Sequence, residues 1–550
     1  MKLIALFLRQ SRTALILSVT AGMFSGLCNA GLLAIINLAL NKKGSETTLI
    51  WIFASLCVLL PFARFTSEFL LSRVGQQATY ELRMQLCRQI LSSRLRHVEE
   101  IGAARLMASL NDDVATLAAA VGAIPLLWVN ASLVVGCLIY MGVLSPVLLL
   151  IVLGFVLLGI GSYQLPIIKV HKLFELARRD TTRLHAHFRA LIQGNKELKL
   201  HASRRNAFLS EELEATADSM RRHNVAAESL YAATASWGQT LVIVVIGMLI
   251  FLAPSIHQFS SRVMVSYAIA LLYFMTPLQI VLNTLPRLTR AKIALSNTEA
   301  LGLELSKQSD GQIASPAQQL RPWSTLRFHS VTHRYRREAE SGDFILGPLN
   351  LTIESGELLF IVGGNGSGKT TLVKLLTGLY LPEDGYISLD DERIGDAKRE
   401  SYRQYFSAVF ADFFLFERML GLNDPKLDVQ AAEYLEQLKL SRVVGVAQGK
   451  LSTTDLSQGQ RKRLALLTAY LEDRPIYIFD EWAADQDPHF KAFFYTQLLP
   501  ELKNKGKTVI VISHDDRYYE IADRLIKLED GQVVSDNTRV MKLSLEPISL

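Results

Sequence analysis

The chain has 550 residues, half of which are hydrophobic, and its formal net charge is +6. One hydrophobic core cannot serve a chain of this length, so several domains are expected. The mean hydropathy of +0.22 is high for a soluble enzyme and indicates a membrane part, whereas the small net charge gives no indication of a nucleic-acid partner.

Six apolar runs in the first part of the chain are long enough to cross a bilayer. They lie at residues 17–40, 47–63, 121–144, 146–164, 236–254 and 263–284. The first continues to about Leu40 and is longer than the apolar core of a signal peptide, so we expect a retained span. The second is the weakest, because it is short and begins with two threonines. Residues 1–304 are therefore predicted to form a six-span transmembrane domain.

The gaps after the second and fourth runs are long, charged and helical in pattern. Both are rich in arginine or lysine, so the positive-inside tendency places them and both termini in the cytoplasm; Lys42 and Lys43 count weakly against this. A helix of about 25 residues is about 37 Å long, so each gap predicts a projecting helical hairpin. Their turns, near Glu99–Ser109 and Gln193–His201, could touch a soluble domain, although ordinary amphipathic loop packing is the alternative.

A polar, linker-like stretch covers residues 305–322. Strands then alternate with helices, for example at Gly356–Val362, Ile476–Asp480 and Thr508–Ser513, and this alternation predicts an α/β domain with a parallel sheet over residues 323–550.

A glycine-rich segment between an apolar strand and a helical stretch fits the pattern Gly-x-x-x-x-Gly-Lys-Thr. Glycines let backbone N–H groups surround phosphate oxygens at a helix N-terminus. Lys369 is expected to reach the β- and γ-phosphates of a nucleoside triphosphate, and the Thr370 hydroxyl to ligate Mg²⁺. The predicted binding residues are Gly363, Gly364, Asn365, Gly366, Ser367, Gly368, Lys369, Thr370 and Thr371.

A second apolar strand, Ile476-Tyr-Ile-Phe-Asp480-Glu481, ends in two acidic residues. A carboxylate at such a strand end, beside a phosphate loop, can hold the Mg²⁺ shell, which suits Asp480. Glu481 is placed to polarise an attacking water as general base.

The segment Leu456-Ser-Gln-Gly-Gln-Arg-Lys-Arg resembles the signature of the ATP-binding cassette (ABC) family, with Gln458 where glycine is most common. A serine hydroxyl and glycine N–H groups at a helix start make an anion site. The resemblance implies that Ser457, Gly459 and Gln460 face the γ-phosphate of ATP on the opposite subunit; a capped helix start is the alternative.

Further positions match the family one by one. Tyr335 resembles the aromatic residue that stacks on adenine, His514 the switch histidine that contacts the γ-phosphate, and Asp487 a residue of the loop that crosses the dimer interface. Six spans followed by one nucleotide domain resemble a half-size ABC exporter, an ATP hydrolase coupled to transport. Such a chain needs a second copy to complete two ATP sites, and a homodimer is the simplest assembly.

Three positions depart from the common exporter pattern. Ala411 occupies the place of a Mg²⁺-binding glutamine, and we expect Asp412 to substitute for it because a carboxylate is a good ligand for a hard cation. Trp482 replaces the proline that usually follows the acidic pair, and the stretch before the signature lacks Gly-Glu-Arg-Gly. A bacterial branch that exports cyclic peptides and pyoverdine-type peptide siderophore precursors is resembled by three parts of the chain together: Gly363-Gly-Asn-Gly-Ser-Gly-Lys, the short region between Ala411 and the signature, and Asp480-Glu-Trp-Ala-Ala-Asp-Gln-Asp-Pro-His.

The expected function is ATP-driven export of a peptide-like secondary metabolite from cytoplasm to periplasm across a bacterial inner membrane. A lipid or glycolipid flippase is the alternative, and the six spans disfavour a soluble regulatory ATPase. Amide side chains in the spans could line a polar cavity. Hydrogen bonding between packed helices is an alternative of at least equal weight. These amides are Asn29, Asn37, Asn130, Gln239, Gln279 and Asn283.

Overall fold

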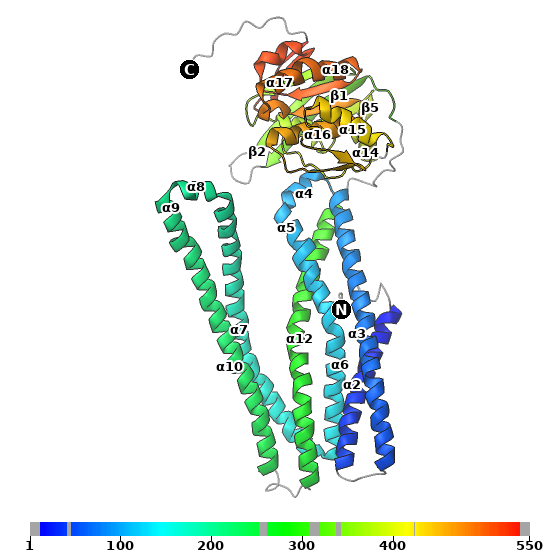
Figure 1. The fold of residues 1–550 in the computed structure, drawn as a ribbon, viewed down its shortest axis with the longest axis vertical. Coiled ribbons are helices and arrows are strands. Elements are labelled where there is room, and N and C mark those ends of the chain that lie inside the picture. Colours follow the sequence, from blue (N-terminus) through cyan, green and yellow to red (C-terminus); the bar gives the residue numbers. More distant parts are fainter. Residues whose placement is uncertain are drawn as a thin grey trace. The chain divides into compact units, whose positions relative to one another are not determined.

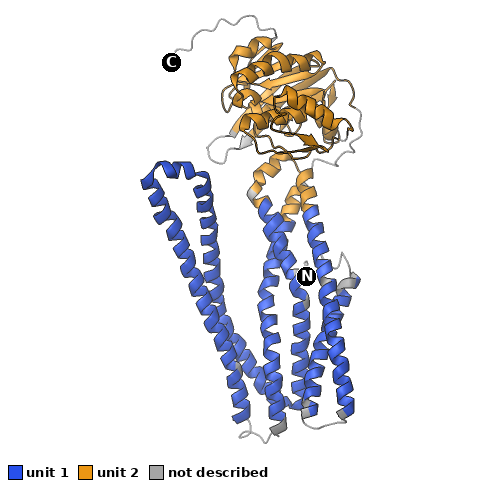
Figure 2. Cartoon of the chain, in the orientation of Figure 1, with its two compact units in different colours: residues 1–84, 107–299 blue, residues 85–106, 300–550 orange. Residues whose placement is uncertain are grey.

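The computed structural model describes residues 12–40, 46–251, 261–307, 320–336, 343–422 and 424–538 (Figure 1). The chain divides into two compact units (Figure 2). Unit 1 comprises Met1–Met84 and Met107–Glu299, and unit 2 comprises Gln85–Leu106 and Ala300–Leu550.

Long helices make up unit 1 as far as it is described. Six segments are long and apolar enough to cross a membrane, which confirms the six predicted spans. The fifth predicted span ends at residue 254, and its last three residues lie outside the described part. The helices are α2 (Arg12–Leu40), α3 (Glu46–Ser92), α6 (Val114–Leu144), α7 (Pro146–Gln193), α8 (Asn195–Leu200), α9 (Ala202–Ala207), α10 (Ala215–Phe251) and α12 (Ser261–Lys307).

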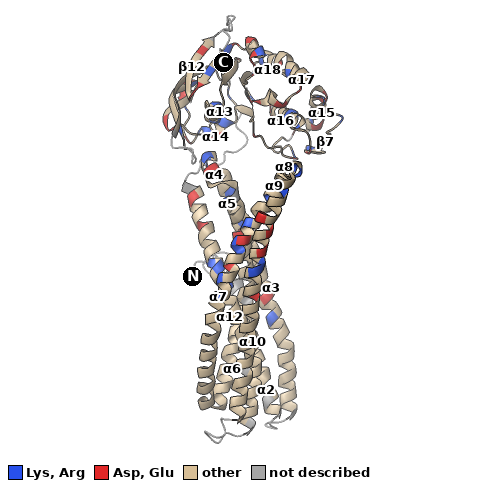
Figure 3. Cartoon of the chain, turned by 90° about the vertical axis from the view of Figure 1, so that its left-hand side faces the viewer, with Lys and Arg blue, Asp and Glu red and all other residues tan. Residues whose placement is uncertain are grey.

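The long helices of unit 1 continue well beyond their apolar runs. Charged side chains gather toward one end of α7 and α10, while the other end is almost free of them (Figure 3). Large apolar side chains such as Trp51 and Leu150 are 75% and 70% exposed, as expected for surfaces that face lipid. At the charged end, α8 and α9 close the hairpin between α7 and α10, at the turn predicted near Gln193–His201.

Hydroxyl groups join the first two spans. Ser18 Oγ donates to the carbonyl oxygen of Ser67 at 2.8 Å, and Ser67 Oγ donates to the carbonyl oxygen of Ser18 at 2.8 Å. Both serines are buried. Such reciprocal bonds satisfy polar groups where water is scarce.

Unit 2 holds two main sheets. A four-stranded antiparallel sheet has the order β2-β1-β4-β5, and a six-stranded sheet has the order β12-β11-β3-β10-β9-β6. All neighbours in the second sheet are parallel except β11 and β12. The strands are β1 (Thr325–Arg336), β2 (Asp343–Glu354), β3 (Leu358–Gly363), β4 (Asp384–Leu389), β5 (Glu392–Arg393), β6 (Phe406–Val409), β7 (Val446–Ala447), β8 (Lys450–Leu451), β9 (Ile476–Asp480), β10 (Thr508–Ile512), β11 (Arg524–Glu529) and β12 (Gln532–Thr538).

The central strands β9 and β10 are buried at every position and apolar except at Asp480 and Thr508, because both faces of the sheet are covered. Successive side chains point to opposite faces: Leu358 and Phe360 of β3 join one hydrophobic cluster, and Leu359 and Ile361 join the other. The covering helices are α13 (Lys369–Leu376), α14 (Arg399–Arg403), α15 (Leu427–Gln437), α16 (Gln458–Glu472), α17 (Pro488–Phe493) and α18 (Leu499–Asn504).

Unit 2 also includes most of the first predicted hairpin turn, as α4 (Leu95–Ile101) and the first part of α5 (Ala103–Ala108). Ser93 Oγ, just before α4, donates to the carbonyl oxygen of Leu305 at 2.9 Å. The end of α12 therefore packs with this turn, and the predicted linker begins inside a helix that runs to Lys307. Residues 308–319 of that linker lie outside the described residues.

Candidate functional site

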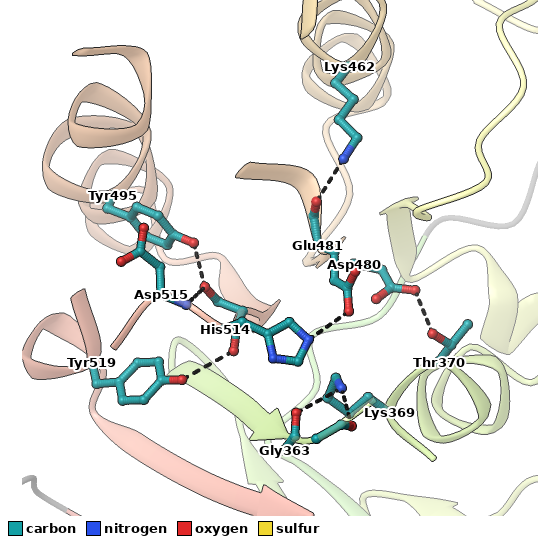
Figure 4. Close-up of polar contacts among 12 residues, drawn as sticks. Gly363, Lys369, Thr370, Lys462, Asp480, Glu481, Tyr495, His514, Asp515 and Tyr519 are labelled. Carbon is teal, nitrogen blue, oxygen red and sulfur yellow. Dashed lines mark hydrogen bonds and ion pairs between the residues drawn. The ribbon is translucent and has the colours of Figure 1, made fainter. Parts of the chain in front are cut away.

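The strand order assembles the predicted nucleotide site. Strand β3 leads into the phosphate loop, β9 ends at Asp480, and β10 between them leads to His514. The carboxyl ends of parallel strands meet at one edge of a sheet, where such folds bind ligands. Three segments that lie far apart in the sequence thus converge at this edge (Figure 4).

The phosphate loop holds its own lysine. Lys369 Nζ donates to the carbonyl oxygens of Gly363 and Gly364 at 3.0 and 2.9 Å. Burial lowers the pKa of Lys369, while the nearby carboxylates of Glu481 and Asp480 raise it. Gly368 has a φ of +99°, and a Cβ there would lie 2.9 Å from Leu346 Cδ1, so the loop requires glycine.

Two buried oxygens at this loop have no hydrogen-bond partner among the described residues, Ser367 Oγ and Asp480 Oδ1. The other carboxylate oxygen of Asp480 accepts from Thr370 Oγ1 at 3.2 Å. Unpartnered buried oxygens are costly unless a ligand satisfies them, so Thr370, Ser367 and Asp480 fit a phosphate with its Mg²⁺. Among the described residues there is no group of three or more His, Cys, Asp or Glu that could hold a metal.

The buried carboxylate of Asp480 is expected to reduce stability when no nucleotide is bound. Burial raises the pKa of Asp480, and the hydroxyl of Thr370 lowers it. Because the net shift is upward, the folded chain binds this proton more tightly than the unfolded chain does. The resulting cost is complete above the folded-state pKa and is lost below the unfolded value of about 3.9.

We therefore expect Asp480→Asn to raise the free energy of unfolding of the nucleotide-binding unit by about 1 kcal/mol at pH 8 and to have almost no effect at about pH 3, below the unfolded pKa. Thermal unfolding without nucleotide or Mg²⁺, recorded across that pH range, measures the gain. Glu529→Gln removes an exposed carboxylate in the same unit and is the control. A gain that does not grow with pH would contradict this account.

Glu481 and His514 face each other at the strand ends. His514 Nε2 and Glu481 Oε1 are 3.0 Å apart, and both side chains are partly exposed. Glu481 has a left-handed backbone, with φ 49° and ψ 32°, which is uncommon outside glycine. The loop before His514 is held in place because the Tyr495 hydroxyl bonds to Ser513 Oγ at 2.6 Å.

The signature segment begins α16, as the capped-helix alternative requires. Ser457 Oγ accepts from the Gln460 N–H at 3.4 Å, and Gln460 Oε1 accepts from the Ser457 N–H at 3.1 Å. A Cβ on Gly459 would lie 2.8 Å from the carbonyl oxygen of Asp485. The start of α16 is therefore packed closely against the turn that follows Glu481.

Asp487 has a structural role within the chain that the sequence did not predict. Its Oδ1 accepts from the Phe490 N–H at 2.9 Å and caps α17, and its Oδ2 pairs with Arg463 at 2.5 Å. The Phe490 N–H and the Arg463 guanidinium lower the pKa of Asp487.

For the other predicted residues, the structure gives the exposure or the position in the fold. Gly364, Asn365 and Gly366 are exposed in the phosphate loop, and Thr371 is half-buried in α13. Asp412 is exposed in the turn after β6. Tyr335 belongs to β1 opposite Phe344, but its side chain lies outside the described residues.

Two basic residues of the signature helix escaped the sequence predictions. Lys462 Nζ lies 2.7 Å from Asp485 Oδ2, and Arg463 Nε donates to Gln486 Oε1 at 2.8 Å. A signal was present in the sequence, because basic residues in the first turns of a helix oppose the helix dipole and require a partner.

The α4 turn contacts the helix of the phosphate loop. Lys374 of α13 donates to Glu99 Oε1 at 2.8 Å, and the buried Tyr380 hydroxyl donates to Glu99 Oε2. Arg96 pairs with Glu383 at 2.8 Å. The prediction that this turn could touch a soluble domain is confirmed.

Unit 1 contains a cavity between α7, α10 and α12. Its volume is about 160 Å³. Its polar lining consists of Tyr163, Tyr231, Gln239, Gln279 and Asn283, among apolar residues.

Three of the six amides from the sequence prediction thus line a cavity. Asn130 instead donates to the carbonyl oxygen of Leu126 at 2.6 Å within its own helix, and Asn29 accepts from the Tyr273 hydroxyl at 3.0 Å. The Asn37 side chain lies outside the described residues.

Each half of the chain matches the model of a known protein family. The family model of the ABC transporter matches residues 346–484, and that of the ABC transporter transmembrane region matches residues 12–278.

Among curated relatives, the ATP-binding protein SyrD of Pseudomonas syringae pv. syringae is 36% identical over 94% of this chain and 93% of its own. An ATP-dependent lipid A-core flippase of Alkalilimnicola ehrlichii is 27% identical over 89% of this chain and 84% of its own. The pediocin PA-1 transport/processing ATP-binding protein PedD of Pediococcus acidilactici is 30% identical over 51% of this chain and 40% of its own.

Among solved structures, a bacterial Atm1-family ABC exporter with ATP bound has the same fold. The TM-score is 0.70 with 17% identity, and the match covers 96% of this chain and 95% of the other.

Proposed function

This chain belongs to the ABC transporter family, with the architecture of a half-size, ATP-hydrolysing exporter, and from that premise we propose that it exports a peptide-like secondary metabolite. The cargo is a cyclic peptide or a peptide siderophore precursor, moved from the cytoplasm to the periplasm across a bacterial inner membrane. Both termini and the charged ends of the hairpins lie in the cytoplasm, since basic residues favour that side.

The observation that carries this proposal is the lining of the cavity in unit 1. It combines two tyrosines and three amides with an apolar wall. Amide side chains donate to and accept from peptide groups at once, and tyrosine adds a flat apolar surface with one hydroxyl. This combination suits an uncharged, amide-rich cargo.

The alternative, a lipid or glycolipid flippase, is favoured by the relationship to lipid A-core flippases. An anionic headgroup would be expected to select basic side chains in its binding site. The described residues that line the cavity include none with a charge, so we rank peptide export first.

In the nucleotide site we assign the roles by the chemistry of each side chain. Lys369 binds the β- and γ-phosphates, and Tyr335 stacks on adenine. Thr370 and Asp480 hold Mg²⁺, with Asp412 as the proposed replacement for the missing glutamine at Ala411. Bound Mg²⁺ would neutralise charge on the phosphates. Glu481 takes a proton from water, and His514 donates to the γ-phosphate.

The active assembly proposed here is a homodimer. Ser457, Gly459 and Gln460 of one copy complete the ATP site of the other, and Asp487 lies at the interface between copies. Half-size exporters of the family normally dimerise, which supports a pair of copies.

Transport into inverted membrane vesicles tests the cargo assignment. We expect the wild-type chain to accumulate a labelled cyclic or siderophore-type peptide in an ATP-dependent manner. Gln279→Leu with Asn283→Leu is expected to reduce the peptide moved per ATP hydrolysed about 30-fold, because each of the two amides loses a hydrogen bond to the cargo of about 1 kcal/mol. The matched control is Asn130→Leu, which removes an amide of the spans outside the cavity.

Two results would contradict the proposal. One is movement of labelled lipid without any peptide accumulation. The other is equal loss of transport in the cavity variants and in Asn130→Leu, because the cavity amides would then act only on packing.

A further inference from the structure

The signature helix carries a lysine that none of the roles above uses. Lys462 belongs to the second turn of α16, yet only 4% of its side chain is exposed. A buried ammonium group requires partners that compensate for its lost hydration. The identity of those partners shows what the residue does.

Both partners of Lys462 belong to the turn that contains the proposed general base. Its Nζ donates to the backbone carbonyl oxygen of Glu481 at 2.8 Å and pairs with Asp485 Oδ2 at 2.7 Å. Figure 4 shows the lysine reaching from α16 to the Glu481 backbone, on the opposite side from His514. In return, the Trp482 indole N–H donates to the carbonyl oxygen of Lys462 at 2.7 Å.

A second set of contacts fastens the same two segments. Arg463 donates to Gln486 and pairs with Asp487, and its guanidinium lies 3.8 Å from the centre of the Phe490 ring. Gln486 Nε2 donates to the carbonyl oxygen of Gly459 at 3.0 Å. The start of α16 and residues 481–487 are thus joined by charged, aromatic and backbone contacts within one chain.

The backbone of Glu481 needs such support. Its left-handed conformation is unfavourable for a residue with a side chain, and its carboxylate direction depends on that conformation. A donor held on its carbonyl oxygen fixes the peptide plane from one side, while His514 contacts the carboxylate from the other.

We propose that Lys462 is a positioning residue that fixes the backbone of Glu481 to α16, so that the anion-binding start of α16 and the hydrolytic carboxylate move as one body. The inference rests on the proposed role of Glu481 and on the proposed homodimer. In that dimer Ser457 acts on the partner's ATP while Glu481 acts on its own. Binding of ATP at one site would therefore change the position of the Glu481 carboxylate at the other site.

The test separates positioning from simple stability by resolving kcat from KM in the full-length chain, with saturating Mg²⁺. Lys462→Met keeps the apolar stem and removes the ammonium group. We expect it to lower kcat for ATP hydrolysis about 30-fold, as misplacement of a catalytic group does, while KM for ATP stays within about twofold. Lys462→Arg restores charge and donors and is expected to recover kcat to within about threefold.

Two further variants assign the effect to the Glu481 contact. Asp485→Asn breaks the ion pair but leaves the donor on Glu481, so its kcat should fall much less than that of Lys462→Met. Lys507→Met is the matched control, because Lys507 also makes a 2.7 Å ion pair, to Asp473, in the same unit. If Lys462→Met does not accumulate as folded protein, Lys462→Gln replaces it, with kcat expected about fivefold below wild type.

Unchanged kcat in the Lys462 variant, or an equal loss of kcat in Lys507→Met, would overturn the inference. A parallel loss of ATP affinity would do so as well. The role of Glu481 is tested separately in Glu481→Gln: full hydrolysis there refutes the general base, whereas an inactive Glu481→Gln beside a fully active Lys462→Met refutes only the positioning role.

Discussion

ATP hydrolysis is expected to fall about 100- to 1,000-fold when Glu481 is replaced by Gln, because a positioned general base contributes a factor of this size. Gln has nearly the same shape and can keep the contact to His514 Nε2 at 3.0 Å. ATP binding should therefore change little, and the variant should hold ATP without cleaving it. Phosphate release and equilibrium ATP binding, measured on the same preparation, check both parts.

The matched control for this prediction is Glu501→Gln. Glu501 also contacts a single basic side chain, Lys505, at 2.7 Å, but on the surface of α18. We expect its hydrolysis to equal that of the wild type. If hydrolysis persists in Glu481→Gln, another group must accept the proton from water.

Transport is expected to separate from hydrolysis when the contact of Glu99 with α13 is broken. Glu99 accepts from Lys374 and from the Tyr380 hydroxyl. Lys374 lies on α13, the helix that begins at Lys369 of the phosphate loop. The contact therefore joins α4 directly to that helix. The spans reach α4 through α3, which continues to Ser92.

Glu99→Gln should weaken this contact by about 2 kcal/mol, the size of charge-assisted hydrogen bonds in partly buried places. A loss of 2 kcal/mol corresponds to a factor of about 30 in an equilibrium, so we expect cargo moved per ATP to fall about tenfold or more. Hydrolysis without cargo should persist, because Glu99 is not part of the nucleotide site. Parallel transport and ATPase assays in reconstituted vesicles measure the ratio.

Glu100→Gln offers a close control for the Glu99 variant. Its side chain is 56% exposed and pairs with Arg96 of the same helix, so its removal should cost little. The exchanged pair Glu99→Lys with Lys374→Glu should recover part of the coupling. No recovery, together with an equal loss in Glu100→Gln, would show that the α4 contact does not transmit the ATP cycle.

Much of the fold could be predicted because it depends on local sequence patterns. Long apolar runs predict strands of a sheet that is covered on both faces. In β3, β9 and β10, successive apolar side chains pack alternately into the two hydrophobic clusters. The phosphate loop could be predicted because its backbone requires glycine where φ is positive, as at Gly368. The spans were readable because a bilayer sets their length.

The contacts that join distant segments could not be predicted in the same way. Glu99 and Lys374 are 275 residues apart, and no periodic pattern relates them. Lys462 looked like one of three consecutive basic residues, and only the fold shows that its side chain is buried against Glu481. Tyr335 as an adenine contact and Asp412 as a Mg²⁺ ligand remain predictions.

The proposed cargo role of the unit 1 cavity has a consequence for how cargo preference can change over time. All its lining residues lie between Phe155 and Asn283, a single contiguous stretch that ends before the first strand of the nucleotide-binding unit. Recombination within this stretch would exchange the whole lining at once and leave the ATP-hydrolysing part intact. Under the cargo role proposed above, such an exchange would change the transported compound and keep ATP hydrolysis.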